Sequence, residues 1–210
     1  MAHPHLLMDL TLVQHCHAVL TGLKLANYFC VPETPEIHRA IERWSRLFPD
    51  YDLGYRLLCA CHGKIGIYIY NHDLLARRLA DPSTAAFLRQ FGYGGMGPEE
   101  ALDRLSTRLH SECQLVGTAS AKRRRLAFPH EIGVFLGYPQ PDVESFIERD
   151  GCDCLLIGSW KVYHDVKTAQ RCFDEYKESL NLLRTELQSG HTLSDCLNCV
   201  RAEMARRRSL

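Results

Sequence analysis

Apolar residues recur at helical spacing near the start of the chain. Between Asp9 and Phe29 they fall near one face, which predicts a first helix there. Val31 and Pro32 end this segment, and Thr34 followed by Pro35 is typical of a helix N-terminus. A second helix is therefore expected over Glu36–Phe48. The face of the first predicted helix consists of Leu12, Val13, Cys16, Leu20, Leu23 and Asn27.

A segment rich in β-branched and aromatic residues comes next and predicts a hairpin. Tyr55–Cys61 and Ile65–Tyr70 are the expected strands, joined by a short turn at His62–Lys64. The following 45 or so positions are expected to be mainly helical, because capping residues and prolines open three apolar segments there. These openings are Asn71, Asp81-Pro82 and Pro98-Glu99-Glu100.

The segment Phe128–Pro139 is ambiguous. It fits a strand, or a short helix that begins at Pro129 and ends at Gly137, and its Ile, Val and Phe centre favours the strand. Residues 116–125 before it are polar and basic without periodicity, and they predict a loop.

The last third combines strand and helix patterns. A helix is expected over Asp142–Glu148, a strand or hairpin over Cys154–Tyr163, and a long helix capped by Asp165. The mixed order of elements predicts an α+β fold, a helical part with a small antiparallel sheet. We expect one α+β domain of catalytic type over residues 1–190, followed by a C-terminal helix and basic tail at 191–210.

Composition narrows the function classes. The chain has 210 residues, 46% of them hydrophobic and 24% charged, as in an ordinary globular protein. Lys+Arg and Asp+Glu both total 25, so no overall field attracts nucleic acid or an anionic membrane. Local basic clusters at Lys122–Arg125 and Arg206–Arg208 are expected to be solvated, and a nucleic-acid partner is disfavoured. Neither a signal peptide nor a membrane span is recognisable, so we expect a cytoplasmic protein with no membrane partner.

The chain has 10 cysteines and 11 histidines, and Cys16 is the sharpest candidate for chemistry. If it lies near the start of the first helix, the helix dipole favours its thiolate. His130 is the preferred partner for proton transfer, and Asp142 would orient its imidazole. Glu131 and Asp165 remain alternatives for the third member. Predicted substrate contacts are Gln14, which would help bind an oxyanion, and Glu131, Trp160 and Tyr163.

Paired cysteines suggest a competing site. Cys152 with Cys154, and Cys196 with Cys199, have the spacing of metal-binding or redox pairs. Together the four thiols could hold zinc or an iron–sulfur cluster, and His130 and Glu131 could serve a metal or haem. A dithiol at the start of a helix would have a lowered pKa at its first cysteine. Inert, reduced thiols are the simpler alternative.

Three sequence blocks carry a family resemblance. HCHAVLTGLKLANYF, FPHEIGVFLGYPQPDVESFI and GSWKVYHDVKTAQRCFDEY span roughly residues 15–176, and together they resemble the bacterial domain-of-unknown-function family numbered 3793. This resemblance brings no catalytic residue with it. It implies a bacterial protein, with a link to iron or redox biology in anaerobes.

The chain order of Cys16, His130 and Asp142 also resembles papain-like cysteine enzymes outside the proteases, such as phytochelatin synthase-like and closthioamide-type amide-forming enzymes. This resemblance implies a papain-like architecture. It also implies acyl transfer, or amide or thioester hydrolysis, through a covalent acyl-enzyme without a cofactor. The acyl substrate would be a small molecule or carried by a protein. The alternative function is a metal- or haem-binding protein of iron or redox homeostasis; no oligomeric state is predicted.

Overall fold

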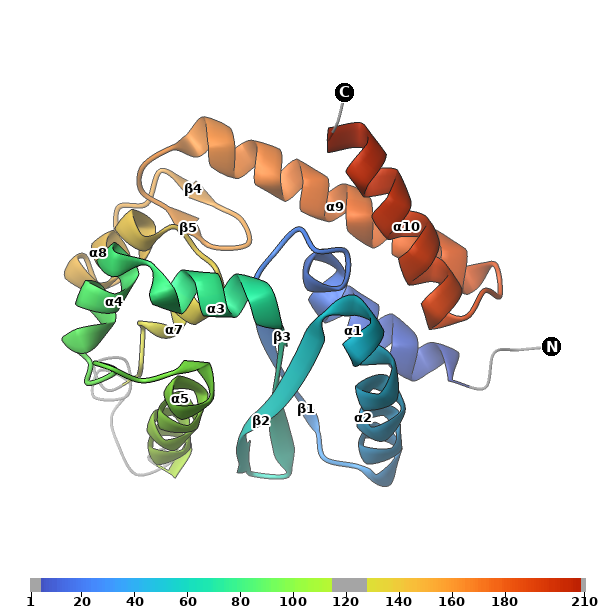
Figure 1. Cartoon of the computed structure of the whole chain (residues 1–210), viewed down its shortest axis with the longest axis horizontal. Helices are drawn as coiled ribbons and strands as arrows, with labels where there is room; N and C mark the ends of the chain where they lie inside the picture. The colour runs from blue at the N-terminus through green and yellow to red at the C-terminus, as the bar shows by residue number, and fades with distance from the viewer. Residues whose placement is uncertain (1–4, 115–127, 209–210) are drawn as a thin grey trace.

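The computed structural model describes residues 5–114 and 128–208 (Figure 1). The polar segment at 116–125, including the basic cluster at 122–125, lies outside these described ranges. The described residues form an α+β fold with a small antiparallel sheet, as the sequence predicts. A papain-like architecture remains only an expectation.

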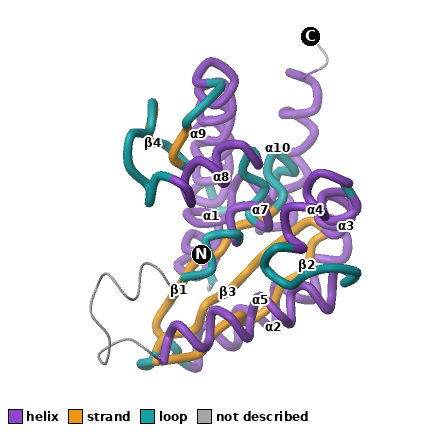
Figure 2. Tube along the Cα trace, turned by 90° about the vertical axis from the view of Figure 1, so that its left-hand side faces the viewer, coloured by secondary structure: helices purple, strands orange, loops and turns teal. Residues whose placement is uncertain are grey.

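A three-stranded antiparallel sheet lies at the centre, with strands in the order β1-β3-β2 (Figure 2). The strands are β1 (Ala26–Pro32), β2 (Leu53–Cys61) and β3 (Lys64–Asn71). The predicted hairpin is thus confirmed as β2 and β3. The sequence does not predict strand β1, because the apolar pattern extends the first helix over most of its residues.

Helices cover the sheet on both faces, and alternation along β3 separates two hydrophobic cores. Ile65, Ile67 and Ile69 face a core built with α1 (Leu6–Leu20), α2 (Pro35–Leu47), α9 (Val166–Gln188) and α10 (Leu193–Arg208). Tyr68 and Tyr70 face the other core. That core is built with α3 (His72–Ala80), α4 (Pro82–Arg89), α5 (Pro98–Gln114), α7 (Ile132–Phe135) and α8 (Gln140–Glu148).

Side-chain caps begin four of these helices where the sequence predicts them. The caps are Thr34, Asn71, Asp81 and Asp165, each of which accepts a hydrogen bond from a backbone N–H three residues later. A 3₁₀ turn (Phe48–Tyr51) follows α2. The C-terminal helix α10 is integral to the first core, to which it contributes Leu197, Val200 and Met204.

Two predictions of local structure are wrong. The first helix begins at Leu6 and ends at Leu20, whereas the sequence predicts it over 9–29. The segment 128–139 contains the short helix α7 and no strand. The preference for a strand rested on composition, whereas the alternative of a short helix between Pro129 and Gly137 is confirmed, and the second core buries this helix.

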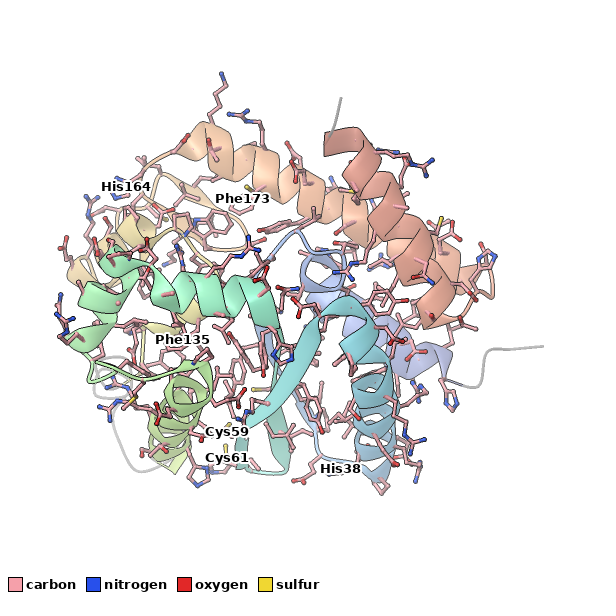
Figure 3. The ribbon with its side chains drawn as sticks, in the orientation of Figure 1. His38, Cys59, Cys61, Phe135, His164 and Phe173 are labelled. Carbon is pink, nitrogen blue, oxygen red and sulfur yellow. The ribbon has the colours of Figure 1, made fainter. Side chains whose placement is uncertain are left out.

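A small hairpin stands apart from the sheet and reaches α9. It consists of β4 (Leu156–Ile157) and β5 (Lys161–Val162), as predicted around Gly158–Ser159. Gly158 allows this close approach, since a Cβ there would lie 2.1 Å from the Phe173 ring of α9. Figure 3 shows Phe173 at this junction. The hairpin thereby brings Ser159 and Trp160 toward the end of α1.

Candidate functional site

A polar pocket of about 240 Å³ lies where α1, β1, the β4–β5 hairpin and α9 meet. Its lining contains no aspartate or glutamate, although it contains a lysine and two histidines. The lining residues are Gln14, His15, His17, Ala18, Val19, Lys24, Asn27, Ser159 and Tyr176. We call it the Lys24 pocket.

The end of α1 places Lys24 in this pocket. Gly22 has a left-handed conformation (φ 74°), its N–H donates to Val19 O, and the N–H of Leu23 donates to Ala18 O at 2.8 Å. This is a Schellman motif, which reverses the chain after a helix. The backbone N–H of Lys24 also donates to Ala18 O. The side chain that follows the turn is therefore folded inward, and Lys24 is only 7% exposed.

Neutral groups surround the Lys24 ammonium. Its Nζ donates to Asn27 Oδ1 at 2.8 Å, and the Asn27 amide in turn donates to the carbonyl of His15 at 2.7 Å. The Tyr138 ring centre lies 5.0 Å from Nζ, which is a cation–π contact. Burial lowers the pKa of Lys24 to about 8. A desolvated lysine with no acidic neighbour in its pocket is typical of functional sites.

His17 is the second perturbed group of the pocket. Burial and, after it, the positive charges of Lys24 and Arg184 lower the pKa of His17 to about 4, so the imidazole is neutral at pH 7. Its Nδ1 lies 2.9 Å from Ser179 Oγ, and that hydroxyl donates to the carbonyl of Tyr176. Which of the two groups donates depends on the tautomer of the ring, and a hydrogen bond to the Tyr176 backbone opposes the lowering of the His17 pKa.

An aromatic stack connects the Lys24 pocket to its neighbour. Tyr138 lies against Lys24 and stacks on Trp160 at 5.6 Å, and Trp160 meets Phe173 edge-on at 4.6 Å. Gly137 permits this arrangement: it has φ 79°, and a Cβ there would lie 2.8 Å from Leu25 Cβ. The three sequence blocks, which supply Lys24, Tyr138 and Trp160, thus converge on one place.

A second pocket of about 220 Å³ lies beside this stack and is lined by aromatic and aliphatic side chains, with His130, Asp142 and Lys161 among them. His130 lines it between Phe128 and Phe146, with ring centres 5.2 and 5.1 Å away. Asp142 and Trp160 line it too, so the structure brings three sequence-predicted residues to one pocket.

Cys16 does not line the Lys24 pocket but is packed inside the first core, within electrostatic range of Lys24. Only 1% of Cys16 is exposed, and burial raises its pKa well above the ordinary range. Because α1 begins at Leu6, Cys16 lies in the C-terminal half of the helix, where the dipole opposes a thiolate. The predicted position near the helix start is therefore wrong. This environment is that of a buried structural thiol.

Asp142 has structural partners. One oxygen accepts from Trp160 Nε1 at 2.8 Å, and the other accepts from the backbone N–H groups of Tyr163 and His164 at 2.8 and 3.1 Å. The buried carboxylate thus anchors the end of the hairpin. Asp165, an alternative third member, is the cap of α9.

Glu131 lies in the second core, only 1% exposed, where it accepts from Tyr93 Oη at 3.0 Å. Arg108 Nε is 2.8 Å from its carboxylate, in an ion pair whose N–H does not point at the oxygen. Of the other predicted substrate contacts, Gln14 lines the Lys24 pocket and accepts from Arg184, whereas Tyr163 is buried.

The cysteine pairs do not form a common site. Cys196 is fully buried in the first core, and its pKa is raised by burial to about 12, the opposite of the lowered value predicted for a dithiol at a helix start. Cys152 is exposed on the loop after α8. Within residues 5–114 and 128–208, no three His, Cys, Asp or Glu side chains are grouped to hold a metal ion.

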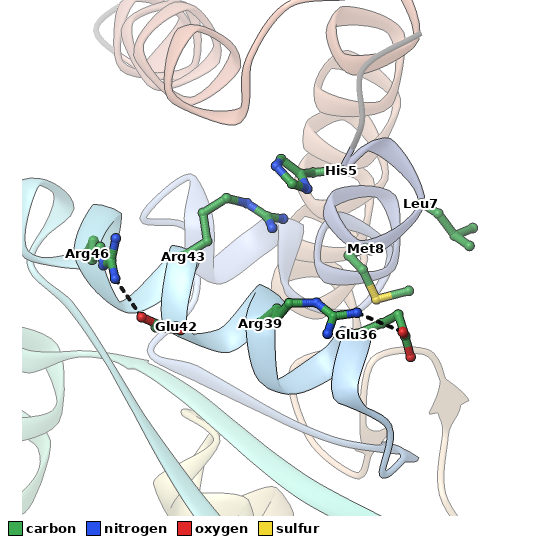
Figure 4. A pocket seen from close by; sticks show the side chains of 8 residues that line it. All are labelled: His5, Leu7, Met8, Glu36, Arg39, Glu42, Arg43 and Arg46. Atoms are coloured by element: carbon green, nitrogen blue, oxygen red, sulfur yellow. Dashed lines mark hydrogen bonds and ion pairs between the residues drawn. The ribbon is translucent and has the colours of Figure 1, made fainter.

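A further hollow, of about 620 Å³, is a groove between α1 and α2 (Figure 4). Its arginines are already paired with carboxylates: Arg39 with Glu36, Arg46 with Glu42, and Arg43 with the buried Asp9. Because each arginine faces a carboxylate, the positive charge of this groove is balanced.

Sequence reasoning missed Lys24, His17 and Asn27 as site residues. A lysine is usually on the surface, and no motif distinguishes this one. The only local signal was Gly22 followed by a lysine between two leucines, in Gly22-Leu23-Lys24-Leu25. That pattern fits a helix end followed by a half-buried strand.

Comparisons with known proteins give one family match for this chain. In the part that the structure describes, no helix is long and apolar enough to span a bilayer. Neither the curated proteins nor the solved structures gave a significant match. A family model described as "Protein of unknown function (DUF3793)" matches residues 12–197, which include all three sequence blocks and the whole Lys24 pocket. The chain therefore belongs to the DUF3793 family.

Proposed function

We propose that this protein binds a small organic anion, a carboxylate or a phosphate ester, in the Lys24 pocket. The observation that carries the proposal is a buried ammonium in a pocket without carboxylates. A desolvated cation is costly unless an opposite charge accompanies it. A bound anion would supply that charge, and it would raise the pKa of Lys24 from about 8 toward its ordinary value.

The other lining groups suit an anion with polar substituents. Lys24 uses one of its three N–H donors on Asn27, which leaves two for a ligand oxygen. The Gln14 and Asn27 amides and the Ser159 hydroxyl lie in the same lining. The neutral imidazole of His17 lies in the same lining and would offer a further hydrogen-bonding group to the ligand.

Thiol-dependent acyl transfer through Cys16, His130 and Asp142 remains a prediction from chain order. The geometry supports it less well than anion binding, because the Cys16 sulfur is packed in the core and Asp142 has other partners. We place the anion-binding function in the cytosol, as the composition suggests.

The test is a ligand screen with matched variants. Thermal unfolding at pH 7 is measured against a panel of carboxylates and phosphate esters, and compounds that raise Tm are titrated by calorimetry. We expect at least one to bind, and Lys24→Met to weaken it between about 10-fold and 100-fold, since a hydrogen bond to a charged group contributes about 1.5–3 kcal/mol. The control Lys167→Met replaces an exposed lysine of α9 and should change nothing. Equal binding by Lys24→Met, or no binding across the panel, contradicts the proposal.

A further inference from the structure

A sharply bent loop joins α8 to the β4–β5 hairpin and carries Cys152 and Cys154. Three of its residues have left-handed backbone conformations: Asp150 (φ 50°), Gly151 (φ 73°) and Asp153 (φ 56°). Asp153 stands between the two cysteines. Non-glycine residues adopt this conformation at a cost, so the surrounding structure holds the bend.

The bend brings the two cysteines within reach of each other. In an extended strand, residues two apart are separated by about 6.6–7.2 Å, at or beyond the limit for a disulfide. A helical or left-handed central residue shortens this distance to about 5.4 Å, from helix geometry, which is within the usual disulfide range. Both sulfurs are also accessible, since Cys152 is exposed and Cys154 is half-buried.

Tyr163 provides a second, independent observation. It is only 5% exposed, and its hydroxyl is buried without a hydrogen-bond partner. Burial first, and then negative charge on Cys154 and Cys152, raise the pKa of Tyr163, so both sulfurs lie within electrostatic range of the phenol, although neither is a hydrogen-bond partner of its hydroxyl. A buried O–H without an acceptor is unfavourable, so a rearrangement of the cysteine loop that gives this hydroxyl a sulfur acceptor would be favoured.

From this juxtaposition we infer that Cys152 and Cys154 form a redox-active dithiol, which closes to a disulfide by exchange with a small disulfide such as oxidised glutathione. The Cys152 thiolate attacks one glutathione sulfur, forms a mixed disulfide and releases one glutathione thiolate. The Cys154 thiolate then attacks the Cys152 sulfur, forms the Cys152–Cys154 bond and releases the second glutathione. The protein loses two electrons and two protons, and oxidised glutathione is reduced to two glutathione molecules.

The chain contains a matched control pair. Cys59 and Cys61 have the same one-residue spacing on strand β2 (Figure 3), and β3 pairs with both of them. The extended backbone of β2 keeps the Cα atoms of Cys59 and Cys61 farther apart than a left-handed bend would, and the Cys59 sulfur is buried, whereas Cys152 is exposed. The inference therefore separates two pairs that the sequence alone makes equivalent.

The experiment equilibrates the full chain without oxygen in glutathione buffers of increasing oxidation, followed by acid quenching, alkylation and trypsin digestion. Cleavage after Arg149 and Lys161 gives a peptide with Cys152 and Cys154 only, and cleavage after Arg56 and Lys64 gives one with Cys59 and Cys61 only. We expect the first peptide to become unalkylated and about 2 Da lighter than its reduced form, while the second stays doubly alkylated.

Two variants of Asp153 test the role of the bend. Asp153→Gly keeps the left-handed conformation accessible and should retain the disulfide. Asp153→Val disfavours that conformation by about 1–2 kcal/mol. The glutathione buffer in which half of its Cys152–Cys154 peptide is oxidised should therefore be about tenfold more oxidising than for wild type. Double alkylation of the Cys152–Cys154 peptide at every ratio, separate mixed disulfides that never close, or equal oxidation of the β2 pair would overturn the inference.

Discussion

Replacing Lys24 with methionine should stabilise the ligand-free protein while removing its anion site. The ordinary pKa of lysine is 10.5, and burial lowers that of Lys24 to about 8. At about 1.4 kcal/mol per pH unit, holding the buried ammonium charged costs about 3 kcal/mol at pH 7. The variant also loses the Asn27 hydrogen bond, which contributes about 1 kcal/mol. Lys24→Met should therefore be more stable by about 2 kcal/mol at pH 7.

The pH dependence of stability shows whether the charge on Lys24 causes the difference between wild type and Lys24→Met. Below pH 8 the lysine is charged in both the folded and the unfolded state, so the folded state bears the full cost. Between about pH 8 and 10.5 the unfolded state binds more protons than the folded state, and wild-type stability rises with pH. The advantage of Lys24→Met should accordingly disappear by about pH 10.

The assay is urea denaturation of wild type, Lys24→Met and the exposed control Lys167→Met at pH 7 and pH 10, in buffers without organic anions or phosphate. The control should match wild type within about 0.5 kcal/mol. If Lys24→Met is less stable than wild type at pH 7, by an amount that does not change with pH, the lysine is a structural residue and the reasoning is refuted.

Three further predictions concern Gly137, Asp142 and Cys16. Gly137→Ala should cost about 2–3 kcal/mol in urea denaturation, because a left-handed conformation and a Cβ 2.8 Å from Leu25 act together. Gly95→Ala, with φ 75° and open space, should cost only about 1 kcal/mol, and equal losses would contradict the packing argument. Asp142→Ala leaves three donors without their acceptor and should cost about 3 kcal/mol, whereas the exposed Asp174→Ala should cost less than about 0.5; similar values would show that Asp142 is not an anchor. Cys16 should resist iodoacetamide at neutral pH in the folded protein while Cys152 is alkylated, as mass spectrometry would show, and alkylation of Cys16 at a comparable rate would favour the thiol mechanism instead.

Local signals determined much of the fold in advance. Thr34, Asn71, Asp81 and Asp165 begin helices because their side chains satisfy backbone N–H groups within the same segment. The β2–β3 hairpin also follows from local alternation and a short turn. Such features depend on neighbours in the sequence, so a single sequence is enough to predict them.

The errors occur where distant contacts decide. Gly22 reads as a tolerated interior glycine, but it ends α1, and the residues after it become β1 because they pair with β3. The 128–139 segment contains the short helix α7 between two turns, although its composition favours a strand. A pairing partner that is far along the chain leaves no local signal.

The candidate site was the least predictable feature. The sequence drew attention to Cys16 because cysteine chemistry has recognisable patterns, whereas the structure buries Cys16 and leaves Lys24 in a pocket. The importance of Lys24 depends on its burial and on the absence of acids from its lining, and both properties are set by β1, α9 and the hairpin together. The three blocks did indicate the right segments, since each contributes to the stack of Lys24, Tyr138 and Trp160.

The most direct test of the anion site is a titration of Lys24 itself. The ¹³Cε resonance of Lys24, assigned by its loss in Lys24→Met, is followed by NMR from pH 6 to pH 12, without ligand and at saturation with an anion from the screen. The anion-site account predicts an apparent pKa near 8 in the free protein and a value above 10 with the anion bound. A free pKa near the ordinary 10.5, or one that the anion does not move, would contradict it.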